Sequence, residues 1–132
     1  MAHIFLSELK TALNECIDEL DEIHFMFCKN PESDFTRNRK LSFRNYIQLM
    51  LQMQSKSVSN EILDFYEHSL QAPSKSAFTQ QHYKLQPEGW NFLFHSFVER
   101  CRTLSENLYN GYRLLACDGS DVNIARNPSD ES

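Results

Sequence analysis

The sequence predicts a mainly α-helical chain, and three observations lead to that prediction. Apolar residues recur at intervals of three and four through the first 28 residues. Serines precede several of the later apolar segments, where they can act as helix N-caps. Only three glycines and four prolines occur among the 132 residues. With 41% hydrophobic and 23% charged residues, the chain has the composition of one folded domain and not of a disordered segment.

The first predicted helix covers about residues 4–28 and carries a single apolar seam. A regular three-four spacing puts the seam on one face of the helix. That face can pack against the rest of its own domain, or it can serve a coiled-coil dimer. We favour packing within the domain, because the flanks of the seam are acidic and do not alternate in sign. The seam consists of Leu6, Leu9, Leu13, Cys16, Leu20, Ile23 and Phe27.

Two further helices are predicted from their start signals in the middle of the chain. Ser42 is a candidate N-cap for a helix over about residues 43–54. Either Ser57 or Ser59 can cap the next one, which runs to about residue 68.

The last two predicted helices differ in character. Ser74 or Ser76 can cap a largely polar helix over about residues 75–84. Pro87 suits the first position of a helix that ends at about residue 104 and is the most apolar in the chain. Its apolar residues, which we interpret as core and not as a base-stacking platform, are Trp90, Phe92, Leu93, Phe94, Phe97, Val98, Cys101 and Leu104.

Charge is distributed unevenly along the chain. The net charge is −5, which argues against a nucleic-acid partner. However, residues 1–34 carry eight acidic and two basic side chains, whereas residues 35–60 carry five basic and no acidic ones. The basic segment at 36–44 therefore has the character of a phosphate-binding patch. Its alternative interpretation is an ordinary solvated loop.

Two short predicted helices, about 59–68 and 75–84, follow one another with a proline-containing turn between them. This is the outline of a helix-turn-helix, whose second helix enters the DNA major groove. From the pattern alone, two helices of a bundle with a solvated polar face are the simpler interpretation. Amide, hydroxyl and ammonium groups suit base edges and phosphates. The candidate DNA-binding residues are Arg37, Arg39, Lys40, Arg44, Lys75, Ser76, Thr79, Gln80, Gln81 and Lys84.

An apolar run at residues 112–117 predicts the first strand, and Asp118 follows it at the start of a turn. A carboxylate at the exit of a buried strand can bind a divalent metal ion, and hard oxygen ligands suit Mg²⁺ or Mn²⁺. From the Asp-Gly turn alone, a carboxylate that bonds only its own backbone is the more common arrangement.

Several other classes of site are disfavoured. The four cysteines show no Cys-x-x-Cys spacing, so neither a zinc ribbon nor a redox motif is present, and we expect reduced thiols in the cytoplasm. His24 and Cys28 could share a metal ion, but packing is the simpler interpretation. The sequence has no Gly-rich phosphate loop, Ser-His-Asp arrangement or HExxH motif. We expect no signal peptide and no membrane partner, because no apolar run approaches about 18 residues.

Three blocks of the sequence together resemble the DDE-type transposases of bacterial insertion sequences, in particular the insertion-sequence-four type. The blocks are FTRNRKLSF at residues 35–43, PSKSAFTQQ at residues 73–81 and YRLLACDGSD at residues 112–121. Their order and spacing also resemble the family, and the resemblance covers about residues 30–128.

The resemblance implies a helical DNA-binding region over about residues 1–108, with a helix-turn-helix-like part at about 59–85. The first strand of a ribonuclease-H-like α/β catalytic domain would follow over 109–132. Such a bacterial, cytoplasmic protein would bind the terminal repeats of its element. It would also form a homodimer or pair with an intact transposase.

The resemblance implies that catalysis needs two aspartates and a glutamate. These residues bind Mg²⁺ or Mn²⁺ in an active site that cuts and joins DNA. Asp118 matches the first of these residues by position. The second aspartate and the glutamate have no counterpart, since Asp121, Asp130 and Glu131 lie too close in sequence to replace them. We therefore expect a fragment that is inactive on its own, with metal used only by the complete enzyme.

Two alternatives remain open at the level of sequence. The chain can be a non-catalytic helical DNA-binding module that regulates transposition. It can also be a helical protein that dimerises through the seam of the first helix and does not bind DNA.

Overall fold

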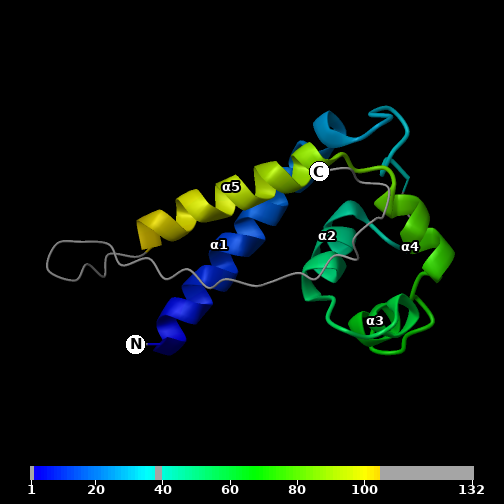
Figure 1. The fold of residues 1–132 in the computed structure, drawn as a ribbon, viewed down its shortest axis with the longest axis horizontal. Coiled ribbons are helices and arrows are strands. Elements are labelled where there is room, and N and C mark those ends of the chain that lie inside the picture. Colours follow the sequence, from blue (N-terminus) through cyan, green and yellow to red (C-terminus); the bar gives the residue numbers. More distant parts are fainter. Residues whose placement is uncertain (1, 38–39, 105–132) are drawn as a thin grey trace, which may run out of the picture.

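Residues 2–37 and 40–104 are described by the computed structural model, and they form a helical bundle (Figure 1). The predicted mainly α-helical fold is confirmed for these residues. The predicted strand at 112–117 and the catalytic domain from residue 109 lie outside them. The elements are α1 (Ala2–Glu22), the 3-10 helix η1 (His24–Phe27), α2 (Phe43–Gln52), α3 (Val58–Phe65), α4 (Lys75–His82) and α5 (Pro87–Leu104).

The two long helices, α1 and α5, lie side by side in opposite directions (Figure 1). Arg100 near the end of α5 pairs with Glu15 and Glu19 of α1. At the other end of the pair, Gly89 lies against Phe27. A Cβ atom on Gly89 would come within 3.2 Å of the Phe27 Cβ atom, so glycine permits this close approach.

The two ends of the segment between α1 and α5 lie next to each other in the fold. Backbone hydrogen bonds from Lys29 N to Lys84 O (2.9 Å) and from Gln86 N to Phe27 O (2.8 Å) join its two ends. The segment forms a separate group of three short helices, α2, α3 and α4, which all contact one another (Figure 1). The candidate DNA-binding residues belong to this group and to the segment that leads into it.

Serine N-caps start the three short helices. The side-chain oxygen of Ser42 accepts the N–H of Asn45, which confirms the predicted start of α2. Of the two alternatives for α3, Ser57 is the cap. Of the two for α4, it is Ser74.

The prediction of one continuous helix over residues 4–28 is wrong at its C-terminal end. The helix ends at Glu22, and the chain continues as the 3-10 helix η1. A backbone hydrogen bond from Met26 N to Ile23 O marks this tighter turn. The His24 ring takes the Asp21 carbonyl as a hydrogen-bond partner and stacks on Phe43 of α2. This tertiary contact redirects the chain where the apolar spacing alone predicted more helix.

One hydrophobic core joins the long pair to the three short helices. Cys16 and Leu20 of α1 are fully buried, and so are Tyr46 and Ile47 of α2. The middle of the apolar seam therefore packs within the domain, whereas Leu6 is 50% exposed. In the described part of the chain, no helix combines the length and apolar character that a membrane span requires. Further core residues are Leu41, Phe43, Leu49, Ile62, Phe78, Leu85 and Leu93.

Candidate nucleic-acid interface

Helix α4 presents a polar face and buries a narrow edge. Phe78 is 6% exposed and belongs to the core. Lys75, Ser76 and Gln80 are exposed, as expected for residues that could meet a partner. Thr79 is partly buried, and its hydroxyl donates to the carbonyl of Lys75 within the helix (3.0 Å).

The connection between α3 and α4 is longer than the sequence predicted. Helix α3 ends at Phe65, so the connection covers residues 66–74 instead of a tight turn after residue 68. A compact helix-turn-helix has a turn of about three to four residues. Glu67 and His68 both adopt left-handed backbone conformations, with φ values of 51° and 56°, and so end α3 early. The two helices are in contact, but they are not joined as tightly as that motif requires.

Lys40 fixes the basic segment to this connection. The hydroxyl of Tyr66 donates to the Lys40 carbonyl (2.9 Å), and the Lys40 ammonium donates to the Leu70 carbonyl (2.8 Å). The basic segment is therefore attached to the connection that leads into α4, and Lys40 lines a hollow together with Ser74 and Ala77. This proximity could not be read from the sequence, in which Lys40 and Lys75 are far apart.

Two of the candidate basic residues are already paired with carboxylates. Arg44 forms an ion pair with Asp18 of α1. The Lys84 Nζ atom lies 3.8 Å from Asp34 Oδ1 and 5.6 Å from the centre of the Phe35 ring. By contrast, Arg37 and Lys75 are exposed, and within residues 2–37 and 40–104 neither makes an ion pair. Arg39 lies outside the described residues.

A cavity of about 510 Å³ lies between the turn at residues 32–37 and the end of α4. Arg37, Gln81 and Lys84, three of the candidate residues, line it together with Leu41. A neighbouring hollow between Lys40 and the α3–α4 connection is also lined by Gln81.

Gln81 is the candidate residue whose position differs most from a DNA-reading side chain. It is 4% exposed, and its buried Oε1 atom accepts no hydrogen bond from the described residues. Leaving such an acceptor unpaired costs about 1–3 kcal/mol. A residue so deeply buried cannot reach base edges from its present position.

The turn that lines the cavity is held by residues that the sequence did not single out. Asp34 is 4% exposed, and its Oδ2 atom accepts the N–H of Asn30 (2.9 Å). Phe35 has a left-handed φ of 58°, which is unusual for an aromatic residue. Its ring packs edge-on against Phe43 (5.1 Å between centres). The partner Lys84 lies far along the chain, so nothing local in the sequence indicated it.

A buried tyrosine attaches α4 to α2. The Tyr46 hydroxyl is hydrogen-bonded to His82 Nδ1 (3.0 Å), while its ring packs against Phe78. Burial raises the pKa of Tyr46 to about 12. The hydroxyl therefore stays protonated well into the alkaline range, and its hydrogen bond to His82 holds α4 in place.

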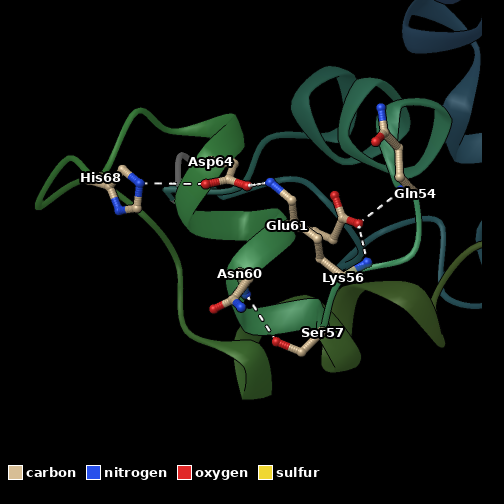
Figure 2. Close-up of polar contacts among 7 residues, drawn as sticks. All are labelled: Gln54, Lys56, Ser57, Asn60, Glu61, Asp64 and His68. Atoms are coloured by element: carbon tan, nitrogen blue, oxygen red, sulfur yellow. Dashed lines mark hydrogen bonds and ion pairs between the residues drawn. The ribbon is translucent and has the colours of Figure 1, made fainter.

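A buried and an exposed carboxylate, Glu61 and Asp64, make the polar contacts that hold α3 in place (Figure 2). Glu61 Oε1 accepts the N–H groups of Gln54 (2.9 Å) and Lys56 (3.0 Å). Asp64 lies between the Lys56 ammonium and the His68 ring on the outer side of the helix. The hydrogen bond from Lys56 lowers the pKa of Asp64. These contacts are structural, and they fix the helix from which the connection to α4 departs.

Metal-binding candidates are not brought together in the described residues. Asp118, the predicted metal ligand, lies outside them. Within residues 2–37 and 40–104 no group of three or more His, Cys, Asp or Glu side chains could hold an ion. His24 stacks on Phe43, and Cys28 is buried at the start of the segment between the two long helices, in agreement with packing roles.

Comparisons with known proteins leave the class of the chain to be argued from its own residues. No family model, curated protein or solved structure matches it.

Proposed function

We propose that this chain is the DNA-binding region of a transposase of the bacterial insertion-sequence DDE type. The described residues would supply DNA binding. Asp118 would be the first metal ligand of a complete catalytic domain, and chemistry would require partners that this sequence does not contain. The proposal is supported by the resemblance of the three sequence blocks and by one arrangement in the structure.

That arrangement is the attachment of the basic segment to the α3–α4 connection through Lys40. Tyr66 and Leu70 bind Lys40 at its two ends. Lys40 also lines one hollow together with Ser74 and Ala77, so the segment lies beside the helix that carries Lys75 and Gln80. Phosphate contacts supply most of the affinity for DNA, and base contacts supply the sequence preference. A basic segment next to an exposed polar helix offers both kinds of contact.

The candidate residues divide into two groups in this proposal. Arg37, Lys40 and Lys75 bind phosphates, whereas Ser76 and Gln80 face base edges. The other described candidates take supporting positions: Arg44 and Lys84 are in ion pairs, Thr79 bonds its own helix and Gln81 is buried.

A salt-dependent DNA titration of a charge-neutralised variant tests this assignment. We expect Arg37→Gln with Lys75→Gln to weaken binding of a random-sequence duplex, since two phosphate contacts are lost. The slope of log K against log salt, measured by fluorescence anisotropy between about 50 and 200 mM, should fall by about 0.9 for each contact.

Lys10→Gln is the matched control, because Lys10 is an exposed lysine on α1, away from the proposed surface. Equal effects of the control and the double variant would refute the assigned surface. For base reading, Gln80→Ala should reduce the preference seen in selection from a random DNA pool while leaving random-sequence affinity nearly unchanged.

A further inference from the structure

The first half of α1 and the last half of α5 extend beyond the three short helices as a two-helix arm (Figure 1). We define the arm as residues 6–13 of α1 and residues 94–104 of α5. Its helices lie together along its length, since Ser7 and Glu8 line one hollow with Thr103 and Leu104. The arm therefore offers a surface of its own, apart from the group that carries the candidate DNA-binding residues.

Helix α5 carries an apolar stripe that continues from the core onto the arm. Trp90 marks the covered part of the stripe, because its ring packs against that of Tyr46 in α2 (6.2 Å between centres). Phe94 and Phe97 follow Trp90 by four and seven residues, so they share its face of the helix. Phe97 is partly buried, but Phe94 is 63% exposed. The stripe therefore runs past the point where α2 covers it.

Helix α1 carries a matching apolar stripe, the seam that packs within the domain. Cys16 and Leu20 of this seam are fully buried in the core. Leu13 and Leu9, nearer the start of the helix, are partly buried, and Leu6 is 50% exposed. Each helix thus leaves apolar side chains partly or largely uncovered beyond the core. We call these side chains the arm surface, which consists of Leu6, Leu9, Leu13, Phe94, Phe97 and Cys101.

The chain itself supplies an apolar segment that can reach the arm surface. Residues 105–132 follow Leu104 at the end of the arm, and they include the apolar run at residues 112–117. The chain from Leu104 to Tyr112 can span up to about 26 Å. Phe94, the member of the surface on α5 that is farthest from Leu104, lies about 15 Å from it along the helix. The run can therefore reach the whole surface.

A segment of the same chain also has an advantage over a second copy as the occupant. Contiguous exposed apolar surfaces mark interaction sites. A short linker keeps a tethered segment at an effective concentration of about millimolar. A second copy reaches such a concentration only in very concentrated protein solutions, so the tethered run occupies the surface first.

We propose that the apolar run at residues 112–117 packs on the arm surface, which makes the two-helix arm the seat for the part of the chain that follows α5. In the proposed transposase, this contact fixes Asp118, which follows the run directly, relative to the DNA-binding region. The inference itself does not rest on DNA binding, because its test contains no DNA.

The test measures amide hydrogen exchange of residues 112–117 in the full chain by ¹H–¹⁵N spectroscopy. Phe94→Asn makes the arm surface polar and should speed exchange of these amides at least about tenfold, since packing on the arm slows it. Leu70→Asn is the matched control, because Leu70 is an exposed apolar residue on the α3–α4 connection (94% exposed). This control should leave exchange at 112–117 unchanged. Unchanged resonances of α2 and α3 report that both variants are folded.

A reciprocal variant changes the run and observes the arm. Leu114→Asn with Leu115→Asn should shift amide resonances of residues 6–13 and 94–104, because the apolar side chains that cover the arm are lost. Ile124→Asn, an apolar residue outside the run, should leave the arm resonances in place.

Three results would overturn the proposal. Equal exchange at residues 112–117 in the wild type and in Phe94→Asn would show that the run does not lie on the arm surface. Arm resonances that stay unchanged when Leu114 and Leu115 are replaced would show the same from the other side. Arm resonances that move with protein concentration in the wild type would assign the surface to a second copy of the chain.

Discussion

Glu61 shows how one side chain can fix a connection between helices. Its Oε1 atom accepts two backbone N–H groups, from Gln54 and Lys56, and the residue is only 9% exposed. Glu61→Ala leaves both N–H groups without this acceptor. We expect a loss of about 2 kcal/mol in the free energy of unfolding, measured with urea.

A conservative variant separates the hydrogen-bond acceptor role of Glu61 from the effect of its negative charge. Glu61→Gln keeps a carbonyl oxygen in the same place and should lose clearly less stability than the alanine variant. If Glu61→Ala unfolds within about 0.5 kcal/mol of the wild type, the two hydrogen bonds have no stabilising role.

Cys28 gives the fold a dependence on alkaline pH. Burial raises the pKa of its thiol from 9.0 to about 11. Because the folded-state pKa is the higher one, the stabilisation is complete below pH 9 and is lost as the pH rises toward 11. The loss from this group approaches about 2 kcal/mol at the upper end of that range.

The measurement compares urea unfolding at about pH 8 and pH 10.5 for the wild type and Cys28→Ala. The variant starts from a lower stability, but it should lose less between the two pH values. An identical loss in both proteins would show that ionisation of Cys28 does not contribute.

Gln80 and Gln81 show how far the burial of single side chains on α4 can be predicted from the sequence. Gln81 follows Ala77 by four residues and Phe78 by three, so helical spacing places it on their buried face. Gln80 lies outside that face and is exposed. The sequence predicted a largely polar helix here, but polar composition alone does not separate the two glutamines.

At the scale of elements, the two left-handed residues after α3 make a stability prediction. Glu67 has a φ of 51° and an exposed side chain. Glycine adopts this conformation without the steric penalty, so Glu67→Gly should stabilise the protein by about 0.5–1 kcal/mol.

Asn91→Gly provides a control of opposite sign, since Asn91 is exposed within α5 and glycine disfavours helix interiors. Thermal unfolding of both variants checks the prediction. A glycine at position 67 that lowers the melting temperature as much as the control would contradict the role assigned to the backbone there.

Helix starts were more predictable than helix ends. Ser42, Ser57 and Ser74 cap their helices through local bonds that the sequence can indicate. The end of α1 depends instead on contacts of His24 with a distant helix. The end of α3 depends on two left-handed residues that carry no glycine signal.

At the scale of the whole molecule, the arrangement of the pieces could not be predicted from the sequence. The bonds that join Phe27 to Gln86 and Lys29 to Lys84 connect positions without any shared motif. The same is true of Lys40 and Leu70, whose contact brings the basic segment to the α3–α4 connection. The spacing of apolar residues predicted the mainly helical class. The contacts between these distant segments are seen only in the folded chain. Asp118 and the predicted strand before it stay predictions, outside the described residues.

The central claim is that the basic segment and α4 form one DNA-binding surface, and mapping the contact on the protein tests it most directly. Amide resonances of the ¹⁵N-labelled full chain would be followed during titration with a random-sequence duplex at low salt. We predict that shifts gather on residues 36–44 and 75–80 and fade as salt is raised, because phosphate contacts are screened. Shifts gathered on α1 and α5, or no shifts at a concentration that saturates basic DNA-binding domains, would contradict the account.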